Sequence, residues 1–504
     1  MKTIYELLKF RANTHPNRKA LFFEGISFSY SDLLKSTNQT ANYLLSLEIK
    51  KGDKFSILDF NTPSTLFLLF AANALGAIPI ILNWRLTPKE IESILVDAKV
   101  KTLFYGNELE EIANKIDSKR IPFSSVNATL FSSIFLKEDI LLSEDDIFVE
   151  LYTSGTTGFP KGVPLSNKNL LSVIRNLATE LPGFGADSIN LVCAPFFHIG
   201  GVGYSLLTLY IGGENILFRK FDPLLVIKAI EERKITNALL VPAMIQAILH
   251  LPELGKLNFS SLRNIQHGGS PISEITLRNA KKIFQCYFTG AYGLTETSGI
   301  SSLLRFDVQE KGLADDATKE DIHRLSSVGK PSPEMDICIK KESGEKAKVN
   351  ELGEVCIKGE YVFSGYTNSH GLEQKEFDDE NWFHTGDIGL LDEEGYLFLF
   401  DRKNDMILSK SENIYPIEVE RVLATHPDIV DVAVVGIPDN EYGEIVTAFL
   451  VLRSGTNIDY SEISSFAKNS LASFKIPRQI FIVNEIPRNL SGKILRKELK
   501  ERFH

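Results

Sequence analysis

From the first residues to about residue 300, stretches that predict β-strands alternate with stretches that predict α-helices. Short apolar runs typical of buried strands lie at 54–60 (KFSILDF) and 188–196 (SINLVCAPF). The segment 31–49 (SDLLKSTNQTANYLLSLEI) instead repeats apolar residues every three or four positions, as an amphipathic helix does. This alternation predicts a layered α/β architecture with largely parallel sheets.

The pattern changes between about residues 325 and 400, where short strands and turns follow one another, as in 351–361 (ELGEVCIKGEY). After Asp401 helix patterns return, including one at 461–477, together with long strand patterns. A chain of 504 residues is too long for one hydrophobic core. We therefore predict an α/β fold class: a large N-terminal domain of layered α/β subdomains plus a small β-barrel-like segment, residues 1–400, and a smaller C-terminal α+β domain, residues 401–504.

One apolar run, 65–82 (TLFLLFAANALGAIPIIL), has nearly the length of a membrane span. Asn73, Gly76 and Pro79 interrupt it, which favours a buried helix, a turn and a buried strand over a transmembrane segment. The N-terminus lacks the apolar core of a secretion signal, and the cysteines form no C-x-x-C pair. We therefore expect a cytoplasmic protein. Peripheral membrane contact is compatible with these features, whereas the net charge of −10 argues against nucleic acid as a main partner.

The segment 151–166 (LYTSGTTGFPKGVPLS) concentrates hydroxyl side chains, glycines and a lysine directly after a predicted strand. Glycines let the backbone approach a phosphate, hydroxyls donate hydrogen bonds to its oxygens, and lysine adds positive charge. Pro160 and the flanking apolar residues favour a structured phosphate-binding turn over a flexible linker. Because glycine follows Lys161 and the glycine spacing differs, the segment is not a Walker loop. The candidate phosphate-binding residues are Thr153, Ser154, Gly155, Thr156, Thr157, Gly158, Lys161 and Gly162.

Eight motifs spread over nearly the whole chain, in this order, resemble those of the adenylate-forming enzymes, the family of acyl-CoA synthetases and aryl-CoA ligases. The resemblance is carried by YTSGTTGFPKGV (152–163), APFFHIGG (194–201), HGGSP (267–271), AYGLTETSG (291–299), GEVCIKG (353–359), WFHTGD (382–387), DRKNDMILSKSENIYPIEVE (401–420) and RNLSGKILRKEL (488–499). It implies that a carboxylic acid is joined to the α-phosphate of ATP with release of pyrophosphate. The acyl group then passes to a thiol.

The resemblance assigns roles near the reacting groups. Glu296 corresponds to the residue that binds Mg²⁺, and Thr295 to one that contacts the α-phosphate; carboxylate and hydroxyl oxygens suit these partners. Lys493 corresponds to the lysine that reaches the reacting carboxylate, although a lysine in such a basic tail is ordinarily a solvated charge. His198 corresponds to a histidine between the acyl pocket and the thiol route. A gating or packing role suits it better than proton transfer.

Further residues are expected to hold the nucleotide. By resemblance Asp387 grips both ribose hydroxyls, for which a carboxylate is a bidentate acceptor, and Arg402 supports it. The residues expected to form the adenine slot are Gly268, Gly269, Ser270, Tyr292 and Gly293.

In this family the C-terminal domain is mobile and swings between two poses about a hinge, which implies that the same holds here. One pose brings Lys493 into the cleft, and the other brings in 409–414 to line the channel for the pantetheine arm of coenzyme A. Asn404 stands at the hinge, where asparagine tolerates unusual backbone angles. Ser411 replaces a glycine that normally lies against the pantetheine arm, which puts thioester formation in question.

The stretches expected to line the acyl pocket are 196–204 and 265–302. The first contains no Lys or Arg to pair with a second carboxylate, which implies a neutral, apolar acyl group. A medium- or long-chain fatty acid is therefore the first expectation and an aryl acid the second. The expected cofactors are ATP, Mg²⁺ and coenzyme A. The alternatives are a ligase that loads an acyl carrier protein and a catalytically silent protein that binds nucleotide or acyl groups.

Overall fold

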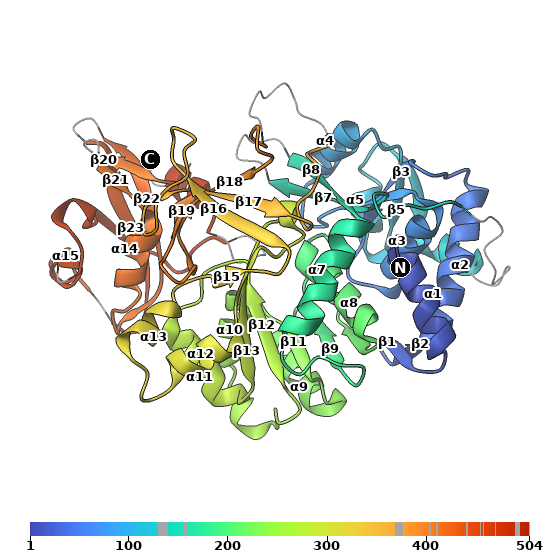
Figure 1. Ribbon diagram of the computed structural model, residues 1–504, viewed down its shortest axis with the longest axis horizontal. Coiled ribbons are helices and arrows are strands. Elements are labelled where there is room, and N and C mark those ends of the chain that lie inside the picture. Colours follow the sequence, from blue (N-terminus) through green and yellow to red (C-terminus); the bar gives the residue numbers. More distant parts are fainter. Residues whose placement is uncertain are drawn as a thin grey trace.

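The computed structural model describes residues 1–129, 140–154, 160–367, 376–402, 405–409, 412–439, 442–453, 455–456, 458–468, 470–488 and 494–502. Over these residues the strands form four sheets, two large ones in the N-terminal part and two smaller ones toward the C-terminus. Figure 1 shows the first two sheets packed with helices and the last sheet at the opposite end of the molecule from the N-terminus. The α/β fold class predicted from the sequence is confirmed.

The longest sheet is parallel through its centre, from β13 to β1, and antiparallel at both edges. The edge pair β1–β2 is the hairpin that turns at Gly25, whose φ is 87°. In spatial order its strands are β15 (Lys330–Pro331), β14 (Ser302–Leu304), β13 (Tyr287–Tyr292), β12 (Asn264–Gly268), β11 (Asn237–Leu239), β9 (Ile189–Val192), β10 (Glu214–Leu217), β1 (Lys19–Phe23) and β2 (Ile26–Ser29).

The second large sheet is parallel except at one edge, where β7 and β8 pair in antiparallel register. The loop between β7 and β8 is the predicted phosphate-binding turn. The strands of this sheet, in spatial order, are β6 (Lys119–Pro122), β5 (Thr102–Tyr105), β3 (Lys54–Leu58), β4 (Ile78–Ile81), β7 (Ile147–Ser154) and β8 (Pro160–Ser166).

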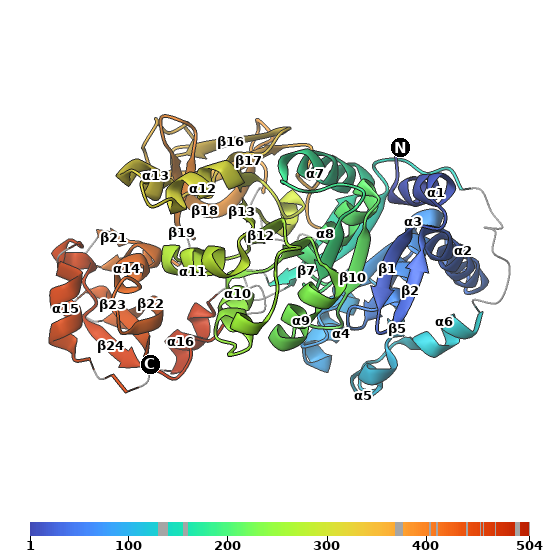
Figure 2. The ribbon, with the colours of Figure 1, turned by 90° about the horizontal axis from the view of Figure 1, so that it is seen from below.

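Helices fill the space between these two sheets and cover their outer faces (Figures 1 and 2). The shared core contains α1 (Ile4–Thr14), α2 (Tyr30–Ser46), α3 (Pro63–Leu75), α7 (Asn167–Glu180) and α8 (Ile199–Ile211). The other face of the longest sheet packs against α9 (Pro223–Arg233), α10 (Pro242–Leu249) and α11 (Glu274–Phe284). The other face of the second sheet packs against α4 (Pro88–Ala98) and α5 (Glu110–Ala113). The remaining N-terminal helices are α6 (Phe123–Thr129), α12 (Phe306–Leu313) and α13 (Lys319–Arg324), with short 3₁₀ turns η1 (Asn107–Leu109), η2 (Leu254–Lys256) and η3 (Thr295–Thr297).

The apolar run 65–82 folds as the sequence predicts. α3 ends at Leu75 because Gly76 takes the left-handed conformation, with φ of 70°, and β4 follows from Ile78. Both elements are almost fully buried in the core. In the part of the chain that the structure describes, no helix is long and apolar enough to cross a membrane.

The third sheet is antiparallel and confirms the small β subdomain predicted after residue 325. Its strands are β16 (Met335–Lys340), β17 (Gly353–Gly359), β18 (Phe383–Leu391) and β19 (Leu397–Arg402). The predicted domain boundary after residue 400 falls inside β19, and it stays a prediction, as does the mobility of the domain that follows.

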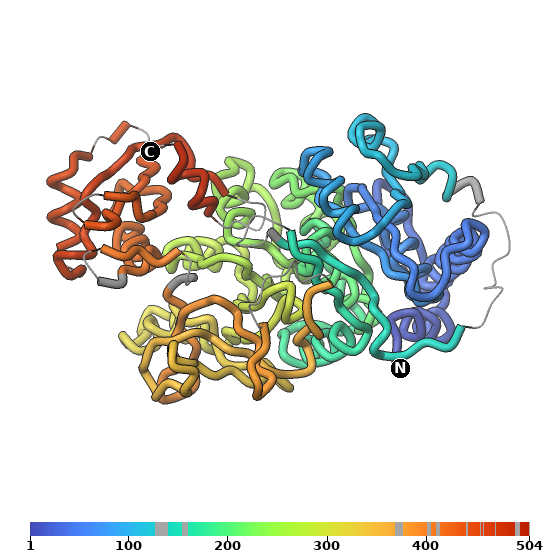
Figure 3. The backbone as a smooth tube through the Cα atoms, turned by 90° about the horizontal axis from the view of Figure 1, so that it is seen from above, coloured from blue at the N-terminus to red at the C-terminus, as the bar shows by residue number. Residues whose placement is uncertain are grey.

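The last sheet belongs to the C-terminal α+β part (Figure 3). It contains β20 (Ile407–Ser409), β21 (Glu412–Ile414), β22 (Ile429–Asp439), β23 (Gly443–Leu452) and β24 (Gln479–Ile482), with α14 (Pro416–Leu423), α15 (Tyr460–Lys468), η4 (Ser473–Lys475) and α16 (Arg496–Arg502). The helix predicted at 461–477 is shorter in the structure. The chain turns after Lys468, where the amides of Ser470 and Leu471 both donate to the carbonyl oxygen of Ala467, at 3.1 and 2.9 Å.

Candidate active site

A cavity of about 1380 Å³ lies where the carboxyl ends of the parallel strands from both large sheets converge. Ligands of open α/β sheets bind outside these strand ends. The segments that follow β4, β9, β11, β12 and β13 all contribute to the wall, and Arg488 and Leu495 reach it from the C-terminal part. The walls therefore combine residues that are up to 400 positions apart in the chain.

The predicted phosphate-binding turn opens into this cavity. Thr153 on β7 lies opposite Lys161 on β8 in the antiparallel register, and both line the wall. The Nζ atom of Lys161 lies 4.5 Å from the centre of the Tyr366 ring. Gly155, Thr156, Thr157 and Gly158 lie outside the described residues, as does the side chain of Ser154.

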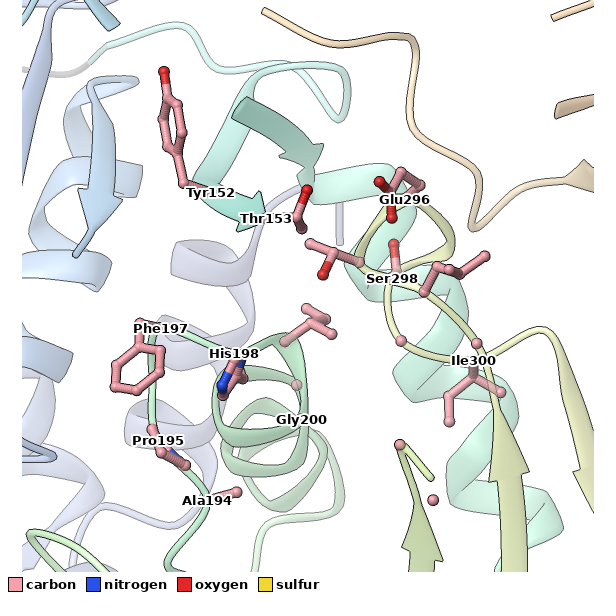
Figure 4. A pocket seen from close by; sticks show the side chains of 18 of the residues that line it. Tyr152, Thr153, Ala194, Pro195, Phe197, His198, Gly200, Glu296, Ser298 and Ile300 are labelled. Atoms are coloured by element: carbon pink, nitrogen blue, oxygen red, sulfur yellow. The ribbon is translucent and has the colours of Figure 1, made fainter. Parts of the chain in front are cut away.

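Glu296 lies on η3 in the wall of the cavity and is only 7% exposed. Its carboxylate oxygen Oε1 accepts a hydrogen bond of 2.7 Å from the hydroxyl of Tyr366. The neighbouring Thr295 also lines the cavity. Figure 4 shows Glu296 and Thr153 at the same end of the pocket. The alternative of an exposed capping glutamate is therefore wrong for this residue.

Asp387 on β18 is 8% exposed and accepts a hydrogen bond of 2.6 Å from the hydroxyl of Tyr292. Arg402 lies opposite Asp387 in the β18–β19 register, so the sheet brings together the two residues expected to hold the ribose. The amide of Gly386 donates to Glu354 Oε1 at 3.1 Å, and His384 Nδ1 lies 3.3 Å from the other oxygen of Glu354. These contacts fix the turn that presents Asp387.

The predicted adenine slot is built from glycines at the ends of β12 and β13. A Cβ atom on Gly268 would lie 2.4 Å from the carbonyl oxygen of Ala291, and one on Gly293 would lie 2.4 Å from that of Gly299. Gly269 has a φ of 79°. These three glycines line the cavity, whereas Ser270 and Tyr292 adjoin it in the chain. The backbone is thus open at the place where a planar base needs to approach closely.

His198 is the N-cap residue of α8 and lies along the cavity from Glu296 (Figure 4). Its ring packs against Phe197, with centroids 4.6 Å apart. The Nε2 atom is buried and has no hydrogen-bond partner among the described residues. Burial, together with the charge of Arg85, lowers the pKa of His198 to about 4, so the imidazole is neutral at pH 7. A neutral ring fits the predicted gating or packing role.

The part of the cavity beyond His198 is largely apolar. Ile199, Gly200, Gly203 and Tyr204 contribute one wall from α8. Further apolar side chains come from α7, from the end of β11, from α10 and from the segment after η3: Val173, Ile174, Leu177, Leu239, Val241, Met244 and Ile300. The two stretches predicted to line an acyl pocket therefore do line this cavity.

Several predicted residues cannot be placed. Lys493, Asn404, Lys410 and Ser411 lie outside the described residues, and only the backbone of Arg402 is described. Their roles stay predictions.

Sequence reasoning missed Arg85, whose guanidinium lies over the Trp84 ring at 4.3 Å and lines the cavity. Burial lowers its pKa to about 10. A signal was available, because Arg85 follows β4, the parallel neighbour of β7, and so had to lie at the same sheet edge as Thr153. Tyr366 was also missed, and the residues around it contain no comparable signal.

Two family models match the chain. The model described as "AMP-binding enzyme" matches residues 8–367, and the model described as "AMP-binding enzyme C-terminal domain" matches residues 418–493.

Curated relatives are similar over nearly their whole length. A fatty acid–[acyl-carrier-protein] ligase, ScoC, from Streptomyces coeruleorubidus is 32% identical, over 100% of this chain and 97% of the relative. A feruloyl-CoA synthase from an Amycolatopsis species is 33% identical, over 98% of this chain and 97% of the relative.

Among solved structures, o-succinylbenzoate CoA synthetase (MenE) from Bacillus subtilis is 29% identical to this chain. In complex with the acyl-adenylate OSB-AMP it superposes with a TM-score of 0.85, over 98% of this chain and 97% of that one. Its complex with ATP and a magnesium ion gives a TM-score of 0.84, over 98% and 99%.

Proposed function

Because the chain belongs to the AMP-binding enzyme family, we propose that it activates a medium- or long-chain fatty acid and transfers the acyl group to coenzyme A. The coarser statement is established: the chain is an acid–thiol ligase that uses ATP, Mg²⁺ and coenzyme A. Membership of this enzyme family sets aside the silent binding protein. The choice of acid rests on one observation, the apolar end of the cavity beyond His198.

The residues at the polar end fit the triphosphate of ATP and its metal ion. In this proposal Lys161 and Thr153 bind phosphate oxygens, and Thr295 contacts the α-phosphate. Mg²⁺ usually binds one or two carboxylates together with phosphate oxygens and water, and the buried carboxylate of Glu296 would hold it here. The bound ion would neutralise charge on the phosphates. Tyr366 keeps the Glu296 carboxylate turned toward Lys161.

The glycine cradle and the Asp387–Tyr292 pair fit the nucleoside. The base would slide against the backbone at Gly268 and Gly293, where any larger residue would collide with a carbonyl oxygen. Asp387 retains acceptor capacity for ribose hydroxyls besides its bond from Tyr292, since a carboxylate offers about four lone-pair sites. In one pose Lys493 would approach the reacting carboxylate and the α-phosphate and neutralise both.

The acyl end fits a neutral acid. An apolar pocket with a few polar groups binds hydrocarbon by removing it from water, and it penalises a second charge that has no partner. An aryl acid is the second candidate, and the similarity to a feruloyl-CoA synthase supports it. An acyl carrier protein is the second candidate for the acceptor, since the relative ScoC is a fatty acid–[acyl-carrier-protein] ligase.

The test is pyrophosphate release by the full chain with a panel of fatty acids from 6 to 18 carbons and a set of aryl acids, each with coenzyme A, with an acyl carrier protein bearing its pantetheine arm, or with neither. The proposal expects the highest kcat/KM for fatty acids and thioester formation with coenzyme A. A higher kcat/KM for aryl acids would support the second candidate acid. Thioester on the carrier protein alone would support the second acceptor.

A further inference from the structure

Tyr204 has a buried hydroxyl that the mechanism above does not use. The side chain lies on α8, lines the cavity and is 4% exposed. Its OH atom is fully covered and has no hydrogen-bond partner among the residues that the structure describes. Buried hydroxyls in native proteins are nearly always hydrogen-bonded, so this atom needs a partner from outside the chain.

The surroundings of this hydroxyl are apolar. The ring of Phe184 meets the Tyr204 ring edge to face, with centroids 6.0 Å apart. α7 contributes Ile174 and Leu177 to the same cavity. Burial, with a smaller effect from Cys193, raises the pKa of Tyr204 well above its ordinary value. The hydroxyl therefore keeps its proton at neutral pH and can both donate and accept a hydrogen bond.

The position of Tyr204 separates it from the reacting groups. It follows His198 by six residues along α8, which corresponds to about 9 Å along the helix axis. His198 itself stands beyond the end of the pocket that holds Thr153 and Glu296 (Figure 4). A substrate group that meets the Tyr204 hydroxyl is therefore several bonds away from the carboxylate that reacts.

Glycines keep the way to this hydroxyl open. Gly200 and Gly203 lie in the same wall as Tyr204. A Cβ atom on Gly200 would come within 3.2 Å of Leu239, whereas one on Gly203 would meet nothing closer than 3.9 Å. The substrate can thus pass along α8 without meeting another side chain of that helix at these positions.

We propose that the Tyr204 hydroxyl binds an oxygen atom, either a hydroxyl or a carbonyl, in the distal part of the acyl group. The enzyme then prefers oxygenated carboxylic acids over hydrocarbon acids of the same size. This inference rests on the proposed function and assigns a substrate class to its acyl pocket.

The experiment compares acids matched in size that differ only in the distal group: 10-hydroxydecanoate with undecanoate, 9-oxodecanoate with decanoate, and 4-hydroxycinnamate with 4-methylcinnamate. The measurement is kcat/KM for pyrophosphate release. In at least one pair the wild-type enzyme should favour the oxygenated acid by about 5- to 50-fold, the range for a hydrogen bond in an apolar site. Tyr204→Phe should reduce that ratio to near one. Tyr210→Phe, the same change on the same helix outside the cavity wall, should preserve it.

The outcomes separate the two proposals. Wild-type preference for the hydrocarbon acid in all three pairs would overturn the inference and leave the proposed function standing. An oxygen preference that survives Tyr204→Phe would also overturn it. Absence of pyrophosphate release with every acid would overturn the proposed function and this inference with it. If the Phe variant failed to fold, the wild-type ratios would still decide between preference and its absence.

Discussion

The hydroxyl of Tyr366 donates a 2.7 Å hydrogen bond to Glu296, and the ammonium of Lys161 lies 4.5 Å from the centre of the same ring. One aromatic side chain thus joins the carboxylate proposed to bind Mg²⁺ to the lysine of the phosphate-binding turn. The ring face attracts the cation while the hydroxyl orients the anion.

Tyr366→Phe should therefore weaken use of the metal while leaving the fold intact. Loss of a hydrogen bond to a carboxylate corresponds to about a 10- to 100-fold change. We expect a higher Mg²⁺ concentration for half-maximal pyrophosphate release, with the KM for the acid little changed. Tyr287→Phe, at an exposed position against Phe306, is the matched control. An unchanged Mg²⁺ dependence would contradict this role for Tyr366.

Gly293→Ala should block the nucleotide. The added Cβ would lie 2.4 Å from the carbonyl oxygen of Gly299, so the backbone has to move. Overpacking of this kind costs about 1–3 kcal/mol, and we expect the KM for ATP to rise about 10- to 100-fold. Gly255→Ala, where the new atom meets nothing within 4 Å, should leave it unchanged. Equal KM values for both variants would show that the base does not approach here.

Stability should fall with pH partly through His267. Burial lowers the pKa of this histidine to about 4, although its contact with Gln309 opposes the shift. Between about pH 6.5 and pH 4 the unfolded chain binds the proton and the folded chain does not, so acid favours unfolding. Across this window the effect amounts to about 3 kcal/mol.

Denaturant unfolding at several pH values tests this contribution. His267→Gln should reduce the loss of stability between pH 6.5 and pH 4, whereas His250→Gln, at an exposed position, should not. The same pH slope in wild type and His267→Gln would show that this histidine is not buried in its neutral form.

Lys493→Ala should separate the two half-reactions. If the lysine enters the cleft only for adenylation, acid-dependent pyrophosphate release should fall about 10²- to 10³-fold. Conversion of supplied acyl-adenylate to thioester should stay within about threefold, because in that pose the lysine lies elsewhere. Lys497→Ala, an exposed neighbour on α16, is the control. An equal loss in both half-reactions would argue against two poses.

The elements that sequence patterns predicted best are those fixed locally. Gly76 ends α3 because glycine takes the left-handed conformation, and the residues around Gly25 form the hairpin β1–β2. The start of α2 was predicted less well: the helix begins at Tyr30 because Ser29 and Asp32 form a capping box, and the predicted start at Ser31 lies inside it.

Contacts between distant parts of the chain were beyond the reach of these patterns. Tyr366 meets Glu296 across 70 positions, and Glu354 supports the turn before Asp387 through sheet pairing alone. The orphan hydroxyl of Tyr204 also becomes visible only when the partners of every neighbouring atom are known. Pocket residues could thus be predicted as stretches, whereas the hydrogen bonds that orient them required the fold.

The central claim, that the convergent strand ends form a site in which ATP activates an acid for transfer to coenzyme A, is tested most directly by product stoichiometry. AMP, pyrophosphate and acyl-CoA are measured together, with one acid, ATP, Mg²⁺ and coenzyme A present. We predict equal amounts of the three products and none without the acid. ADP and phosphate in place of AMP and pyrophosphate, or AMP formed at the same rate without any acid, would contradict the claim.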